Sequence, residues 1–293
     1  MSRIQDILAK ADRDGTARRL PSSPGMGAPA TVLTPHFDST ATLPNPFTSP
    51  MPLGGDTLGA KAPAAAPVSD VPHAVALEPR TARATLHPAL VAAIAPHSEI
   101  AEQFRAIRSK LTQREEQGSL RTIGITSPAS GEGKSVTAAN LALTMAQELQ
   151  RSVVLVEGDL RRPAVHSLFA IDRGPGITDV LSGEATLDEA LVHLPEFRLT
   201  LLPAGGAAGY PTELLGSTSM RRLLDALASR FDRIVLDLPS ALPLADVGTL
   251  APHLDGVLMV VRAGVTQRPT LDQALGIFEE QKVLGVVLNE AHV

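Results

Sequence analysis

The sequence has no cysteine, no tryptophan and one tyrosine among its 293 residues. The absence of cysteine excludes disulfide bonds, cysteine-ligated zinc, iron–sulfur clusters and thiol nucleophiles. No apolar run approaches the ~18 residues of a transmembrane helix, and the charged N-terminus lacks the apolar core of an export signal. Basic residues (26) are fewer than acidic ones (31), which disfavours a nucleic-acid binder held by a broad basic surface. These absences predict a cytoplasmic protein that neither inserts in a membrane nor binds nucleic acid.

Proline marks a change in composition near residue 96, because 14 of the 24 prolines lie at or before it. Residues 16–97 mix Pro, Ala, Ser, Thr and Gly without a sustained hydrophobic period, which predicts a disordered linker. Before the linker, four apolar residues recur at helical spacing, so residues 1–15 are predicted to form a short amphipathic helix. This helix is either a docking peptide for a partner or a frayed terminus. Residues 98–293 are predicted to form the folded domain.

The folded part of the chain alternates short β-branched runs with helical stretches. Such alternation is typical of a parallel sheet with both faces covered, and right-handed crossovers make the sheet doubly wound. We therefore predict an α/β fold with a doubly wound, mainly parallel sheet. The predicted strands are 121–127, 152–157, 198–203, 233–238, 256–262 and 283–289. The predicted helical stretches are 134–149, 164–194, 211–230, 244–254 and 267–281.

The most specific motif is the glycine-rich segment 131–135 (GEGKS), between a predicted strand and a predicted helix. Its glycines let backbone amides approach phosphate oxygens, and the helix N-terminus adds partial positive charge. Lys134 would reach the β- and γ-phosphates of a nucleotide, and the Ser135 hydroxyl would ligate Mg²⁺. The standard pattern has glycine where this chain has Pro128, so the loop is a variant. The residues predicted to bind the nucleotide here are Ser130, Gly131, Glu132, Gly133, Lys134, Ser135 and Val136.

Acidic residues follow two of the other predicted strands. Glu157 and Asp159 lie at the end of the run 153–156, and Asp237 ends the run 234–236. In this fold class the carboxyl ends of the strands lie beside the phosphate loop. An unpaired carboxylate at the end of a buried strand is costly, and a hydrated Mg²⁺ ion is its natural partner. Each acid alone could be a surface ion pair, but together with a phosphate loop they indicate a magnesium–nucleotide site.

These three elements, in this order, resemble the deviant-Walker P-loop ATPases that include MinD and ParA. A finer similarity is to the bacterial tyrosine kinases of the CpsD/CapB type (BY-kinases), which serve capsule and exopolysaccharide production. MinD and ParA relatives usually carry a signature lysine where this chain has Ala129, which favours the BY-kinase branch. The resemblance covers residues 98–291 and is carried by the segments 102–108, 126–135, 159–163, 176–183, 211–215 and 255–262.

The resemblance implies a protein tyrosine kinase that uses ATP and Mg²⁺, with roles for individual residues. Lys134 and Ser135 would hold phosphates and Mg²⁺. Asp159 would position or deprotonate the acceptor and help to bind Mg²⁺, and Asp237 would orient metal-bound water. The implied metal ligands are thus Ser135, Asp159 and Asp237. Glu157 stands where the family usually has the first Asp of an Asp-x-Asp pair, and its extra methylene group can displace the charge in an aligned transfer site.

The resemblance also suggests a base contact and a subunit contact. Asn289, at the end of the last predicted strand, is similar to the Asn that contacts adenine in these ATPases. Glu102, Arg105 and Arg108 resemble the Glu-x-x-Arg-x-x-Arg motif that builds a ring of subunits in the family. On a helix the three residues share one arc, apart from an apolar stripe that can pack on the chain's own domain. The charged arc either meets a neighbouring subunit or is a solvated face.

The tyrosine content departs from the family pattern. BY-kinases typically phosphorylate a C-terminal tyrosine cluster on a neighbouring subunit, whereas this chain has only Tyr210, in a predicted loop. We interpret Tyr210 as a loop aromatic rather than an acceptor. The resemblance implies a homo-oligomer and a membrane polysaccharide copolymerase as partner, which would hold the protein at the inner membrane. Two alternatives are an ATP-operated assembly switch without kinase activity and a ParA- or MinD-like positioning ATPase.

Overall fold

The computed structural model describes residues 80–291, apart from Gln117 and Leu244. The predicted helix at 1–15 and most of the predicted linker lie outside these residues. In the part of the chain that is described, no helix is long and apolar enough to cross a lipid bilayer.

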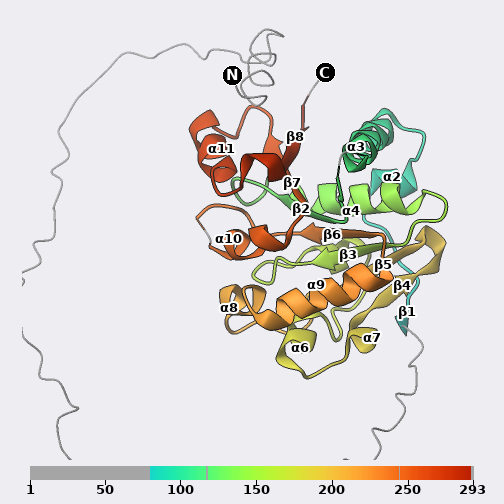
Figure 1. Ribbon diagram of the computed structural model, residues 1–293. Coiled ribbons are helices and arrows are strands. Elements are labelled where there is room, and N and C mark those ends of the chain that lie inside the picture. The colour runs from blue at the N-terminus through green and yellow to red at the C-terminus, as the bar shows by residue number, and fades with distance from the viewer. Residues whose placement is uncertain (1–79, 117, 244, 292–293) are drawn as a thin grey trace, which may run out of the picture. The chain divides into compact units, whose positions relative to one another are not determined.

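Within the described residues, eight strands form one sheet (Figure 1). They are β1 (Arg80–Thr81), β2 (Thr122–Thr126), β3 (Val153–Glu157), β4 (Val192–Leu194), β5 (Leu199–Leu202), β6 (Arg233–Asp237), β7 (Gly256–Arg262) and β8 (Val283–Asn289). Their order across the sheet is β1-β4-β5-β3-β6-β2-β7-β8. Every neighbouring pair is parallel except β4 and β5. All six predicted strands are present, and the mainly parallel sheet is confirmed.

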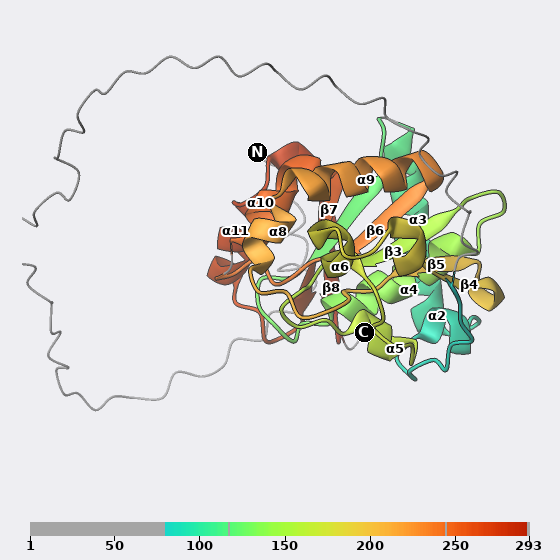
Figure 2. The same ribbon diagram turned by 90° about the horizontal axis from the view of Figure 1, so that it is seen from below.

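Helices cover both faces of the sheet, as a doubly wound fold requires. The two helices α4 (Lys134–Ala146) and α9 (Thr218–Arg230) lie on opposite faces (Figure 1, Figure 2). The other helices are α2 (Val91–Ile94), α3 (Glu99–Glu115), α5 (Val165–Leu168), α6 (Ile177–Ser182), α7 (Leu187–Ala190), α8 (Pro211–Leu215), α10 (Asp246–Leu250) and α11 (Arg268–Leu275). Short 3₁₀ turns lie at η1 (Pro195–Phe197), η2 (Ala251–His253) and η3 (Glu280–Lys282).

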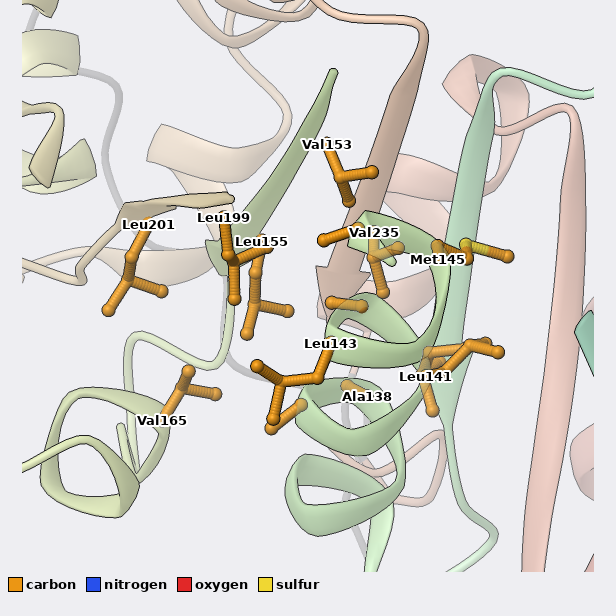
Figure 3. Packing of buried hydrophobic residues seen from close by; sticks show 14 of the residues in the cluster. Ala138, Leu141, Leu143, Met145, Val153, Leu155, Val165, Leu199, Leu201 and Val235 are labelled. Atoms are coloured by element: carbon orange, nitrogen blue, oxygen red, sulfur yellow. The ribbon is translucent and has the colours of Figure 1, made fainter. Parts of the chain in front are cut away.

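Helix α4 is buried on nearly all sides, which fixes the position of its N-terminus. Its apolar side chains, Leu143 among them, lie against Leu155 of β3 and Val235 of β6 (Figure 3). Because successive strand residues point to opposite faces, the residues between these contribute to the core under α9. The strands are therefore continuously apolar, as expected for a sheet covered on both faces. Burial of α4 holds the phosphate loop that precedes it.

The segment 80–97, predicted as the end of the disordered linker, belongs to the fold. Strand β1 pairs with β4, and Leu90 is fully buried in the core. The Asn140 side chain of α4 fastens this segment: it accepts a hydrogen bond from Ala92 N and donates one to Ala89 O, both at 2.9 Å. The structure thus corrects the domain boundary placed at residue 97.

The predicted helical stretch 164–194 is also corrected, because it is broken into short pieces. Gly174-Pro175-Gly176 separates α5 from α6, since proline cannot continue a helix and glycine favours turns. Gly183, with φ of +77°, then ends α6. The last three residues of the stretch form β4, which runs antiparallel to β5.

The sheet order brings three predicted site segments to one edge. Strands β3, β6 and β2 are adjacent in the centre of the sheet and run parallel. Glu157 and Asp237 are register partners at the carboxyl ends of β3 and β6, and the phosphate loop follows β2. Side chains far apart in the sequence therefore meet around the N-terminus of α4.

Candidate active site

The phosphate loop between β2 and α4 depends on two glycines. Gly131 and Gly133 have φ of +86° and +94°, the left-handed region that favours glycine. A side chain at Gly133 would also collide with Asn289, because its Cβ would lie 2.2 Å from Nδ2. Gly133 stands at the N-cap of α4, and no side chain caps the helix there. The first amide groups of α4 are thus left to an external anion, which suits a phosphate group.

Lys134, Ser135, Asp159 and Asp237 form one buried cluster at the start of α4. The Lys134 Nζ atom lies 2.7 Å from Asp159 Oδ2 and 3.5 Å from Asp237 Oδ1. The Ser135 hydroxyl donates a hydrogen bond of 2.7 Å to Asp237 Oδ2. Lys134, Asp159 and Asp237 are all buried. The structure therefore brings together the four residues predicted to handle phosphate and Mg²⁺.

Burial sets the protonation chemistry of this cluster. Burial raises the pKa of Asp237 to about 6, although Lys134 and the hydrogen bond from Ser135 oppose the shift; the negative charge of Asp159 adds to it. For Lys134, burial alone would lower the pKa, but the charges of Asp237 and Asp159 outweigh burial and raise it. Lys134 is therefore held as a cation, and a further cation nearby would stabilise the charged form of Asp237.

The donor set suits Mg²⁺ as that further cation. Magnesium prefers oxygen ligands and usually takes one or two carboxylates, with water and phosphate oxygens completing its octahedron. Asp159 and Asp237 supply two carboxylates, and Ser135 supplies a hydroxyl. Among the described residues there is no group of three or more His, Asp or Glu that would hold a metal on its own. The residues present thus fit an ion that is bound together with a nucleotide.

Glu157 does not join this cluster directly. Its carboxylate is fully buried and accepts hydrogen bonds from three donors: His166 N at 3.2 Å, His166 Nδ1 at 2.9 Å and Ala204 N at 2.8 Å. It links β3 to the start of α5 and to the loop after β5. The sequence did not indicate a role for His166. It lies nine residues after Glu157, and no local pattern marks a contact over that separation. Whether Glu157 takes part in catalysis stays a prediction.

Glu132, inside the phosphate loop, is braced from two sides. Its carboxylate accepts a hydrogen bond of 3.0 Å from Ala129 N and another from the hydroxyl of Thr266. Thr266 lies in the turn after β7, where its hydroxyl also accepts a hydrogen bond of 2.9 Å from Arg262 N. On the other side, Asn289 Nδ2 donates a 3.0 Å hydrogen bond to Glu132 O. Asn289 therefore contacts the loop directly, while Thr266 is a partner that the sequence analysis missed.

The loop after β3 carries two arginines with different surroundings. Arg161 is paired with the buried carboxylate of Asp246, at 2.7 Å, and also donates to the Thr212 hydroxyl at 3.0 Å. Arg162 is exposed; its Nη1 lies 3.3 Å from Ser130 Oγ, and its backbone N donates to Asp159 Oδ1 at 3.0 Å. Of the residues predicted to bind the nucleotide, Ser130 thus lies beside Arg162 and Ser135 belongs to the Lys134 cluster, whereas Val136 packs against the core.

The predicted oligomer contacts on α3 are engaged within the chain. Arg105 pairs with Glu102 at 2.6 Å and donates to Pro96 O at 2.7 Å. Arg108 donates to the backbone of α4, at Thr144 O (2.8 Å), and pairs with Glu148 at 3.2 Å. Of the three, Glu102 is exposed, and the two arginines are partly buried. Their contact with a second subunit stays a prediction.

Tyr210 lies immediately before α8 and is 74% exposed. It has no hydrogen bond or ion pair through its side chain among the described residues.

A cavity of about 490 Å³ lies away from the phosphate loop, at the opposite edge of the sheet, where it is lined by Arg121, Arg221, His253 and their neighbours. That cavity contains none of the predicted site residues. The candidate site is therefore the cluster around the phosphate loop and not this cavity.

Comparison with known proteins gives several relatives that are named as tyrosine kinases. Tyrosine-protein kinase YwqD of Bacillus subtilis is 33% identical over 202 residues, which cover 68% of this chain and 85% of the relative. Succinoglycan biosynthesis transport protein ExoP of Rhizobium meliloti is 34% identical over 201 residues, which cover 67% of this chain but 25% of ExoP. The crystal structure of the chimerical protein CapA2B2 is similar with a TM-score of 0.67 and 28% identity, covering 74% of this chain and 95% of that structure. No model of a protein family matches.

Proposed function

Since the chain belongs to the family of bacterial tyrosine-protein kinases, we propose that it transfers the terminal phosphate of ATP to tyrosine hydroxyl groups of other proteins. The observation that carries this proposal is the meeting of Lys134 with Asp159, at 2.7 Å, and with Asp237 at the mouth of the phosphate loop. A bound Mg²⁺ ion would neutralise charge on the phosphates during transfer.

Each residue of the Lys134 cluster would have its own role in the transfer. Lys134 would turn from the two carboxylates to the β- and γ-phosphates. The amides of the phosphate loop would bind the oxygens of the same phosphates. Ser135 and Asp237, together with Asp159, would hold a bound Mg²⁺ ion in place. Asp159, at the edge of the cluster, accepts the proton of the tyrosine hydroxyl as its oxygen bonds to the γ-phosphorus. The bond to the bridging oxygen breaks, and ADP leaves. Positioning and charge supply most of the catalysis in such transfers.

We extend the proposal to the base of the nucleotide. Asn289 lies at the end of β8, beside Gly133, and its Nδ2 is already bonded to the loop. Its Oδ1 has no hydrogen-bond partner among the described residues. That oxygen can accept a hydrogen bond from the exocyclic amine of adenine, which would favour ATP over nucleotides that lack this amine.

The names of the relatives support a proposal for the biological setting. ExoP is named for succinoglycan biosynthesis and transport, and this chain matches only a quarter of it. We propose that the chain acts in capsule or exopolysaccharide synthesis, in the cytoplasm, with a membrane polysaccharide copolymerase that holds it at the inner membrane. The charged arc of Glu102, Arg105 and Arg108 would contact a second copy, in a homo-oligomer that closes as a ring.

Radiolabel transfer from [γ-³²P]ATP tests the kinase proposal. The purified full chain is incubated with Mg²⁺, with and without a random copolymer of glutamate and tyrosine. We expect label on the copolymer, lost in Lys134→Met and when Mg²⁺ is chelated. Lys110→Met, an exposed lysine on α3, is the matched control and should keep the activity. Tyr210→Phe tells whether the chain labels its own tyrosine; label that disappears in this variant would make Tyr210 an acceptor.

Two other results would support a different function. Phosphate release that depends on Lys134, without label on any protein, would favour an ATP-operated assembly switch. Nucleotide-dependent movement along DNA or membrane, without transfer, would favour a positioning ATPase. Absence of both transfer and hydrolysis would contradict an enzymatic role.

A further inference from the structure

We propose that the guanidinium group of Arg162 binds the terminal phosphate of the nucleotide and thereby lets the site distinguish ATP from ADP. The inference rests on the proposed nucleotide binding and adds a residue to it. Arg162 follows β3 and lies three residues after Asp159.

The backbone of Arg162 is held in place, whereas most of its guanidinium group is free. Its backbone N donates a 3.0 Å hydrogen bond to Asp159 Oδ1, so the residue is tied to the Lys134 cluster. Its side chain reaches the phosphate loop, where Nη1 lies 3.3 Å from Ser130 Oγ. Both Arg162 and Ser130 are exposed. The cation therefore stands at the entrance of the loop, with most of its N–H donors unused.

The charges around the loop identify Arg162 as the cation available to a ligand. Lys134 is matched by the carboxylates of Asp159 and Asp237, which leaves that cluster with a formal charge of −1. Arg161 is committed to Asp246 at 2.7 Å. Arg162 has no carboxylate within 4.0 Å among the described residues. An incoming triphosphate thus meets one cation that needs no ion pair to be broken first.

The chemistry of guanidinium suits a terminal phosphate. Its planar fork of N–H donors matches two phosphate oxygens at once, and it stays charged at any pH that the protein tolerates. A terminal phosphoryl group offers three oxygens at the outer end of the nucleotide. In phosphate loops the amides and the lysine already contact the β-phosphate, which ATP and ADP share. A cation at the entrance therefore adds affinity mainly for the phosphate that only ATP has.

Binding measurements on the full chain test this assignment. Dissociation constants for ADP and for the non-hydrolysable β,γ-imido analogue of ATP are measured in Mg²⁺ by calorimetry. We expect Arg162→Ala to weaken binding of the ATP analogue about 10-fold or more and to leave ADP within about 2-fold. Arg162→Lys, which keeps the charge but loses the fork, should fall between the wild type and Arg162→Ala. Arg221→Ala, an exposed arginine at the opposite edge of the sheet, should change neither constant.

The outcomes separate this inference from the proposed function. Equal weakening of both ligands, or no change in either, would overturn the role of Arg162 while nucleotide binding stands. A wild-type chain that binds neither ligand would overturn both. The unfolding free energy in urea should be the same for Arg162→Ala and the wild type. A large loss of stability would show a structural role instead and would also contradict the inference.

Discussion

The carboxylate of Glu157 lies 2.9 Å from the imidazole Nδ1 of His166, and both side chains are largely shielded from solvent. A second oxygen of the same carboxylate accepts a 2.8 Å hydrogen bond from Ala204 N. The family resemblance assigned Glu157 to catalysis. Both of its carboxylate oxygens instead accept hydrogen bonds, from α5 and from the loop after β5. The geometry indicates a residue that holds the walls of the site together.

This arrangement predicts that the length of the Glu157 side chain matters for stability. Glu157→Asp keeps the charge but withdraws the carboxylate from its donors, so we expect the unfolding free energy to fall by about 2 kcal/mol. His166→Ala should cost about 1–2 kcal/mol for the same reason. Urea titration measures both, and Glu184→Ala, an exposed acid after α6, is the neutral control. Unchanged stability of Glu157→Asp with an altered Mg²⁺ dependence of phosphate transfer would instead support a catalytic carboxylate.

Thr266 gives a prediction that contrasts with that for Arg162. Its hydroxyl connects Arg262 N, at 2.9 Å, to the carboxylate of Glu132 inside the phosphate loop. Thr266→Val keeps the shape and removes the bridge, so the loop loses part of its bracing before any ligand binds. We expect the dissociation constants of ADP and of the ATP analogue to rise together, about 10-fold, which is ~1.4 kcal/mol. Thr266→Ser, which retains the hydroxyl, should bind both nearly as well as the wild type. Selective loss of ATP binding would contradict a role in bracing.

Much of the fold and the centre of the site could be predicted because their signals are local. Six continuous apolar runs, a glycine-rich loop and strand-end acids are each visible within about ten residues of sequence, and topology then brings them together. The two strands that were missed, β1 and β4, have two and three residues, too few to show a period. His166 and Thr266 were missed for a different reason. Their roles depend on partners 9 and 134 residues away, and no local pattern marks such contacts.

The pair of Arg161 and Asp246 predicts a pH-dependent contribution to stability. Burial alone would raise the pKa of Asp246, but hydrogen bonds from Arg161 and Thr212 together outweigh burial and lower it. A carboxyl with a lowered pKa in the folded state stabilises the protein above its unfolded pKa of ~3.9, and this stabilisation is lost as the pH falls through the folded value. Arg161→Ala should therefore cost most at neutral pH.

The size of this effect is limited by solvent. The side chain of Arg161 is 39% exposed, whereas that of Asp246 is 1% exposed, so we expect a loss of about 2 kcal/mol at pH 7 rather than the larger cost of a fully buried pair. Urea titrations at pH 7 and pH 3.5 measure it. The difference between Arg161→Ala and the wild type should shrink at the lower pH, and Arg222→Ala, an exposed arginine on α9, should show no difference at either. A deficit that grows on acidification would contradict the assignment.

The segment ahead of α3 offers the sharpest test of where the folded domain begins. Leu90 is fully buried against α4, and the backbone around it is bonded to Asn140. Leu90→Ala would leave a cavity in the core, so we expect a loss of about 3 kcal/mol in the unfolding free energy. Ile94→Ala, four residues on and 51% exposed, is the matched control and should cost less than about 1 kcal/mol. Equal, small effects of both substitutions would mean that residues 80–97 do not pack on the domain in solution, and the predicted boundary at residue 97 would then be correct.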